Sequence, residues 1–192
     1  MTSSLVGSEM CIRDRFFNGH TNITSSRFLV FGVKGMLSAA KNVRNAMLFN
    51  VLSFMSDKLL TVGNTVAALD ELYIWLSNPT AIEYIRNCLK RVRKKESAML
   101  LASQNLEDFD QEGVREMTKP LFSIPPHQFL FNAGSIDKRS YMDMLQLEES
   151  EYNLIKFPQR GVCLYKCGNE RYLLEVHAPA YKEKLFGTAG GR

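Results

Sequence analysis

Two acidic residues that directly follow a short apolar run have the types and spacing best suited to catalysis in this sequence. The run is Val66-Ala-Ala-Leu69, and Asp70 and Glu71 come next. At the carboxyl end of a buried strand, an aspartate can hold the Mg²⁺ shell and a neighbouring glutamate can orient or activate water. This pattern suits phosphoryl transfer. The alternative is that both acids only begin the next helix, where carboxylates favour the positive end of the dipole.

A glutamine and a basic run lie close by in the sequence. Residues 98–102 (AMLLA) form another apolar run, and Ser103 and Gln104 follow it. A polar side chain in that place can sense a γ-phosphate or position water. The cations at 90–95 are most simply a solvated helix end. One arginine among them can still reach the phosphate of a neighbouring subunit as an arginine finger.

The elements that must position these residues alternate between apolar runs and helical patterns. Apolar residues at helical spacing predict a helix at 42–58, and Asn78 before Pro79 predicts a capped helix at 79–95. Continuous runs of β-forming residues predict buried strands, which are typical of parallel sheets. These strands are expected at 28–33, 65–69, 98–102 and 128–132. The alternation predicts an α/β fold, a three-layer sandwich with a mostly parallel sheet in which residues 66–69 are almost fully buried.

The last third of the sequence predicts two helices, a hairpin and a final short helix. The hairpin follows from the turn chemistry of Cys167-Gly-Asn-Glu170 between two apolar segments. Cys163 and Cys167 are expected on one strand, on the same face, because their separation is even. The predicted ranges are 135–147 and 148–156 for the helices, 161–166 and 171–177 for the hairpin strands, and 180–186 for the last helix.

Composition excludes several classes of protein. The 192 residues are 45% hydrophobic and carry a net charge of only +4, so the chain is expected to be one ordered domain rather than a disordered segment. No apolar run approaches the ~20 residues that span a bilayer. The four cysteines and three histidines lack the spacing of a zinc site. The thiols are interpreted as reduced and the compartment as cytoplasmic.

The first residues, MTSSLVGSEMCIRDR, do not have the pattern of a signal peptide. The stretch from Met10 to Arg15 resembles the in-frame translation of a transposase-type sequencing adaptor. Residues 1–15 are therefore expected to be a non-native tail. The alternative is a natural disordered terminus.

Residues 70–109, DELYIWLSNPTAIEYIRNCLKRVRKKESAMLLASQNLEDF, resemble the stretch from Walker B to the glutamine motif of the conjugal-transfer ATPases. These are the large cytoplasmic ATPases of VirB-type type IV secretion systems. The end of the chain, from Arg160 to Arg192, also resembles that family's carboxyl terminus. Arg93 stands eleven positions before Gln104, and this ordered set is also similar to the wider HerA–FtsK group of P-loop motors. The resemblance covers about residues 28–192.

The resemblance implies that residues 16–192 are the carboxyl-terminal part of a motor domain with a partial RecA-like P-loop core and an appended hairpin. Asp70 is then the Walker B acid of the magnesium shell, Glu71 the catalytic glutamate, and Gln104 the sensor of the γ-phosphate. Arg93, and less surely Arg171 in the hairpin, are the candidates for an arginine that acts in trans. Arg160 is a weaker one.

The same resemblance implies ATP and Mg²⁺ as cofactors and a hexameric ring as the assembly. Other type IV secretion subunits are implied as partners, at the inner face of the cell membrane, where the cytoplasmic ATPase would associate peripherally. Two alternative functions remain. One is a DNA-translocating motor of the HerA–FtsK type, and the other is a non-enzymatic docking module with the same fold.

One motif of the family is absent. The sequence contains no Gly-Lys-Ser or Gly-Lys-Thr, and Gly32-Val-Lys-Gly35 has the wrong order and spacing for a Walker A loop. That loop supplies the backbone cradle for the phosphates and a lysine for the β/γ charge. We therefore expect that the loop lies upstream in a longer parent protein and that this chain alone does not hydrolyse ATP.

Overall fold

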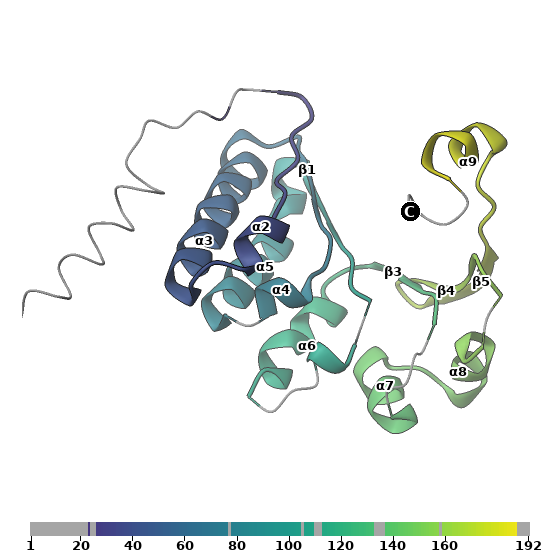
Figure 1. Cartoon of the computed structure of the whole chain (residues 1–192). Helices are drawn as coiled ribbons and strands as arrows, with labels where there is room; N and C mark the ends of the chain where they lie inside the picture. The colour runs from purple at the N-terminus through teal and green to yellow at the C-terminus, as the bar shows by residue number, and fades with distance from the viewer. Residues whose placement is uncertain are drawn as a thin grey trace, which may run out of the picture. The chain divides into compact units, whose positions relative to one another are not determined.

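A computed structural model of the chain describes residues 23, 26–76, 78–104, 106–109, 113–132, 137–157 and 159–187. The tail at 1–15 that was expected to be non-native lies outside these residues. The chain divides into two compact units, Met1–Phe54 and Met55–Arg192, which are described separately (Figure 1). The boundary falls within helix α3, Lys41–Asp57.

The strand predicted at 28–33 is wrong. These residues form no regular element, and the next element is the short helix α2, Lys34–Leu37. Phe28 is 83% exposed, whereas Phe31 packs edge-to-face against Phe54 with ring centroids 5.6 Å apart. A β-forming run becomes a strand only where a neighbouring strand accepts its hydrogen bonds. Among the described residues, none pairs with this run.

The long helix predicted at 42–58 is confirmed by α3. A π-helical turn, Lys58–Val62, continues it and ends at Gly63. Gly63 has a φ of +79°, and a Cβ atom at this position would lie 2.8 Å from the Lys95 carbonyl oxygen. Glycine is required there because both the left-handed backbone and the close approach exclude a side chain. The chain then enters the first strand.

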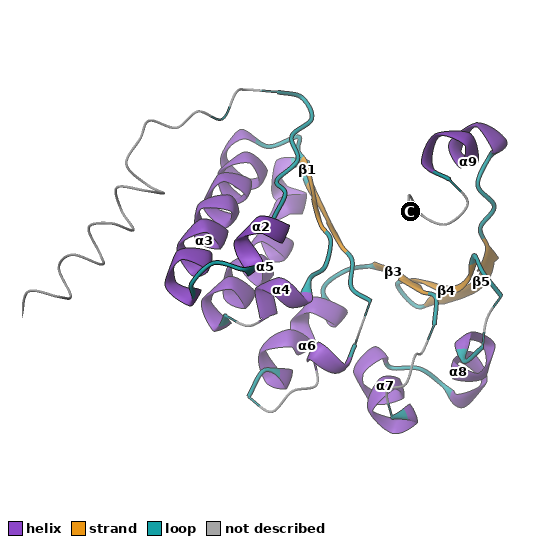
Figure 2. Cartoon of the chain, viewed as in Figure 1, coloured by secondary structure: helices purple, strands orange, loops and turns teal. Residues whose placement is uncertain are grey.

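The first sheet is a parallel pair, as the sequence predicts (Figure 2). Strand β1, Val66–Leu69, pairs with β2, Ala98–Leu101, in a register that sets Val66 opposite Ala98. The connection between them contains α4, Tyr73–Leu76, then α5, Pro79–Arg91, and the 3₁₀ turn Val92–Lys95. It is a βαβ unit, the usual way to join two parallel strands.

The burial expected of β1 is wrong. Val66 is 67% exposed and Leu100 is 61% exposed, and Ala68, on the same face, is exposed as well. On the other face, Leu69 is buried and Leu101 is half-buried. The described residues cover only one face of this pair, whereas a central parallel strand is covered on both.

Helix α5 begins and packs as its sequence predicts. The Asn78 side chain accepts hydrogen bonds from the backbone N–H groups of Thr80, at 2.9 Å, and Ala81, at 3.4 Å. Its apolar face is buried, including Ile82 and Ile85. Asparagine caps and an early proline satisfy or avoid the unpaired donors of the first turn. The helix is thus fixed at the end that follows the acidic residues.

The second sheet is antiparallel, with the strand order β3–β4–β5. Its strands are His127–Leu130, Val162–Cys167 and Glu170–Glu175. The predicted hairpin is confirmed, and Cys163 and Cys167 both lie on β4. The predicted strand at 128–132 exists as β3, but it pairs antiparallel with β4 rather than extending the parallel sheet. The expectation of a mostly parallel sheet is therefore met only by β1 and β2.

Helices α7, Lys138–Leu145, and α8, Glu149–Ile155, confirm the two helices predicted before the hairpin and form a core with β4. Tyr141, Ile155 and Leu164 are buried there. The sequence analysis did not predict α4 or α6, Arg115–Ser123, which contains Pro120. The last helix, α9, spans Ala180–Phe186 as predicted. None of the described helices is long and apolar enough to cross a membrane.

Candidate functional site

The carboxyl ends of β1 and β2 are held together beyond the strands themselves. The Ala102 N–H donates to the Leu69 carbonyl at 2.9 Å, and the Leu72 N–H donates to the Ala102 carbonyl at 3.0 Å. These bonds fix the segment that contains Asp70 and Glu71 beside the segment that leads to Gln104. In open α/β sheets, ligands bind outside this edge.

Glu71 and Gln104 contact each other directly. The Gln104 amide, through Nε2, donates to Glu71 Oε1 at 2.8 Å. One oxygen of the carboxylate is thereby oriented, while Oε2 keeps its lone pairs as an acceptor for another donor. The two residues are 33 positions apart in the sequence, and the parallel pairing brings them together as the sequence analysis predicts.

Glu71 has an unusual backbone conformation. Its φ of +53° lies in the left-handed region, where a side chain other than glycine costs about 1–2 kcal/mol. Asp70 Oδ1 accepts a hydrogen bond from the Glu71 N–H at 3.0 Å, and the Ile74 N–H donates to the Glu71 carbonyl at 3.0 Å. These contacts hold the sharp turn between β1 and α4. The sequence gives no signal for this conformation.

Asp70 is exposed at the same edge. Mg²⁺ that accompanies a nucleotide is usually bound by one or two carboxylates, with phosphates and water completing its shell. The adjacent carboxylates of Asp70 and Glu71 fit that donor set. Within the described residues, no cluster of three or more His, Cys, Asp or Glu side chains could hold a metal without such extra ligands. The acids immediately precede α4, which is only four residues long, so a helix-start role alone explains little of the arrangement.

Arg93 lies at the other end of β2. It is an exposed residue of the 3₁₀ turn that precedes the strand, whereas Gln104 follows the strand. The four residues of β2 span about 13 Å at ~3.3 Å per residue. Arg93 therefore does not join Asp70 and Glu71 within one chain, in agreement with the expectation that it would act, if at all, on another copy.

Arg171 is held by its own chain. Its Nε lies 3.2 Å from Glu151 Oε1, and its Nη1 donates to the Gly168 and Glu170 carbonyls at 2.9 Å each. These contacts connect the hairpin turn to α8. Arg160 is exposed in the loop before β4. The structure brings neither Arg171 nor Arg160 to the Glu71–Gln104 pair.

The chain is similar to proteins of conjugal transfer. No family model matches it. It is 28% identical over 141 residues to a probable conjugal transfer protein TrbE of Sinorhizobium fredii (strain NBRC 101917 / NGR234), a match that covers 71% of this chain and 20% of that protein. It is 31% identical over 101 residues to the conjugal transfer protein TrbE of Rhizobium radiobacter, covering 52% of this chain and 12% of that protein.

A solved structure agrees with these matches. VirB4 of Thermoanaerobacter pseudethanolicus superposes with a TM-score of 0.74 and 30% sequence identity, over 83% of this chain and 44% of that one. The chain thus spans a fifth or less of the curated relatives it matches and under half of the solved VirB4 chain. It is a homologue of the TrbE and VirB4 proteins, and the resemblance to conjugal-transfer ATPases of type IV secretion systems is confirmed.

Proposed function

We propose that the chain is the carboxyl-terminal part of an ATP-hydrolysing motor that powers type IV secretion and conjugative transfer. The observation that carries this proposal is the hydrogen bond between Gln104 and Glu71, at the carboxyl ends of two paired parallel strands. It joins a residue that can sense the γ-phosphate to one that can act on water. The similarity to TrbE and VirB4 supplies the class of motor.

Each residue at this edge has a distinct proposed role. Asp70, exposed beside the turn, holds the magnesium shell. Glu71 accepts a proton from the attacking water at Oε2, because Oε1 is engaged by Gln104. Gln104 holds the carboxylate in place and signals the presence of the γ-phosphate through that same bond. When bound, ATP with Mg²⁺ supplies the phosphoryl group and the metal charge that stabilises it.

The arginine that completes the site is proposed to come from another copy in a hexameric ring. Arg93 is favoured because it is exposed and remote from its own chain's acids. Arg171 is a second candidate, although it would first have to leave Glu151 and two carbonyl oxygens. Further proposals are a cytoplasmic location at the inner face of the membrane and contacts with other secretion subunits.

The exposed face of β1 and β2 supports the finer proposal about the fold. Val66 and Leu100 are apolar and open to solvent, which a parallel pair rarely tolerates. We infer that further elements of a longer parent cover this face. The result would be the three-layer, RecA-like sandwich, and the parent would also carry the phosphate-binding loop.

The test compares this chain with a longer protein that includes the upstream loop. The 192-residue chain is expected to show no ATP hydrolysis, whereas the longer protein hydrolyses ATP with Mg²⁺. Glu71→Gln in the longer protein should lower the rate by roughly 10²–10⁴-fold and spare nucleotide binding, because only the water-activating group is lost. Steady-state phosphate release and nucleotide affinity give the two readouts.

Glu96→Gln is the matched control. Glu96 is also exposed and also left-handed, with a φ of +54°, but it lies at the amino end of β2. Its substitution should leave the rate unchanged. Undiminished hydrolysis by Glu71→Gln would refute the role of Glu71. Magnesium-dependent hydrolysis by the short chain, lost on Glu71→Gln, would refute the missing loop. A longer protein without activity would favour a docking module.

A further inference from the structure

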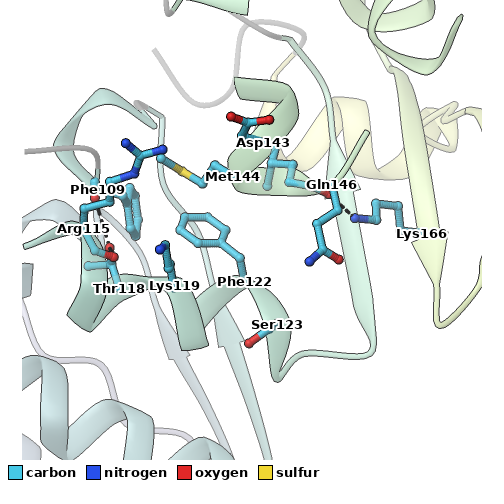
Figure 3. A pocket seen from close by; sticks show the side chains of 11 residues that line it. Phe109, Arg115, Thr118, Lys119, Phe122, Ser123, Asp143, Met144, Gln146 and Lys166 are labelled. Atoms are coloured by element: carbon cyan, nitrogen blue, oxygen red, sulfur yellow. Dashed lines mark hydrogen bonds between the residues drawn. The ribbon is translucent and has the colours of Figure 1, made fainter. Parts of the chain in front are cut away.

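A pocket distant in sequence from the acidic edge is lined mainly by α6 and α7, with Lys166 of β4 at its wall (Figure 3). Its volume is about 490 Å³, within the range of roughly 300–1,000 Å³ that is usual for sites of small organic molecules. None of its lining residues belongs to the proposed ATPase site.

The charged groups that line this pocket are predominantly cationic. They are Arg115, Lys119 and Lys166, against the single acid Asp143. A concave surface with an excess of one charge raises the local concentration of ions of the opposite sign. The lining therefore favours an anion.

Lys166 is the most unusual of these cations, because it is only 8% exposed. Its ammonium donates to the Leu145 carbonyl, an uncharged acceptor. Among the residues that the structure describes, no carboxylate pairs with it at ion-pair distance. Burial lowers the pKa of Lys166, and the Arg171 guanidinium lowers it further, while Glu151 opposes the shift. A buried charge of this kind is costly until an anion compensates it.

Lys119 can contribute to the same anion site. Its ammonium pairs with Glu116 at 2.5 Å, but both side chains are largely exposed. Exposed pairs of this type contribute about 1 kcal/mol or less, so Lys119 can exchange its partner at low cost. In Figure 3, Lys119 and Lys166 lie on opposite sides of the Phe122 ring.

The pocket also has an aromatic wall. Phe109 and Phe122 pack edge-to-face with ring centroids 4.9 Å apart, and Met144 lines the space as well. Apolar side chains beside cations suit a ligand that has both an apolar body and an anionic group. A bare inorganic ion would leave this wall in contact with water.

We propose that this pocket binds a small organic anion, with its phosphate or carboxylate group at Lys166 and Lys119 and its apolar body against Phe122. The ligand is defined by the two features of the pocket together: buried positive charge and an aromatic surface. The proposal is independent of ATP hydrolysis, because it uses none of the residues at the acidic edge.

The test uses three matched probes on the whole 192-residue chain, measured by isothermal titration calorimetry. Phenyl phosphate carries both features, inorganic phosphate only the charge, and benzyl alcohol only the ring. Phenyl phosphate should bind in a saturable 1:1 manner, at least about tenfold more tightly than either partial probe. Equal binding of phenyl phosphate and inorganic phosphate would show an unspecific ion site, and no saturable binding would refute the pocket.

Variants locate the binding. Lys166→Met and Lys119→Met should each weaken phenyl phosphate by about tenfold or more, since each removes a charge-assisted contact. Lys182→Met, on the exposed helix α9, should have no effect. Asp143→Asn should strengthen binding several-fold, a gain that misfolding does not produce. Unchanged affinity in Lys166→Met and Asp143→Asn would overturn the proposal.

Discussion

The two sheets of this chain differ in what covers them. In the antiparallel sheet, β4 packs against α7 and α8, and Leu164 is only 2% exposed. In the parallel pair, Leu100 stands on an open face and is 61% exposed. Both residues are leucines in strands of the same unit. The difference therefore lies in the elements around them and not in the side chains.

The comparison separates stability from chemistry. The antiparallel sheet has a core of its own but none of the acids that suit catalysis. The parallel pair carries Asp70, Glu71 and Gln104 at its carboxyl edge but is open on one face. Ligands in α/β proteins bind at such edges, whereas cores supply most of the free energy of folding. The predictions below test how far the two regions behave as this contrast implies.

The largest expected effect comes from the two leucines. Leu164→Ala should lower the free energy of unfolding by about 2–5 kcal/mol, since it leaves a cavity in a packed core. Leu100→Ala should cost about 0.5 kcal/mol or less, because exposed substitutions seldom matter. Urea unfolding measures both, with Trp75, the single tryptophan, reporting on the α4 region. Equal losses would mean that the face around Leu100 is covered in solution.

The same contrast explains which parts of the fold the sequence could predict. Local signals were sufficient for α5, where Asn78 and Pro79 mark the start, and for the hairpin, where Gly168 and Asn169 form the turn. The strand at 28–33 failed because β-forming residues do not reveal whether a partner strand exists. The burial of β1 failed for a similar reason, because covering elements are a tertiary property.

The candidate site shows the same limit. That Gln104 lies close to Glu71 follows from a general rule: the carboxyl ends of adjacent parallel strands meet at one edge. The left-handed φ of Glu71 follows from no such rule, since Asp-Glu-Leu is an ordinary sequence. The cationic pocket was not predicted, because Arg115, Lys119 and Lys166 are separated in sequence and only packing brings them together.

The second prediction concerns the support of the parallel pair. Asn78→Ala should lower stability by about 1 kcal/mol, because two N–H groups at the start of α5 lose their acceptor. Asn87→Ala, on an exposed position of the same helix, is the control and should raise stability by a few tenths of a kcal/mol, since alanine is the better helix former. Urea unfolding followed by Trp75 fluorescence checks both. Equal effects would exclude the cap as the cause.

The third prediction uses pH to probe the antiparallel region. The pKa of Lys166 is lower in the folded chain than its ordinary value of 10.5, so folding disfavours the charged form. This penalty is fully present below the folded pKa and disappears as pH rises through 10.5. The stability of Lys166→Met relative to the original chain should therefore fall between pH 7 and pH 10.5. Thermal unfolding across this range provides the measurement.

Leu164→Ala is the control for that series. It removes no titratable group, so its effect should stay constant with pH. A constant difference for Lys166→Met as well would show that the Lys166 ammonium is solvated in the folded chain. The buried cation would then no longer distinguish this region from the parallel pair.

The smallest expected effect compares the two ends of the parallel pair. Glu71 and Glu96 are both left-handed, with φ of +53° and +54°, and only Glu71 contacts Gln104. Glu96→Gly should stabilise the chain by up to about 1 kcal/mol, because strain is relieved while the unfolded state gains entropy. Glu71→Gly gains the same relief but loses an exposed hydrogen bond, so it should stabilise less. The difference between the two variants in urea unfolding measures that bond. If Glu71→Gly were the more stabilising, the contact with Gln104 would contribute nothing to folding, and its geometry would have to be explained by the chemistry of the site alone.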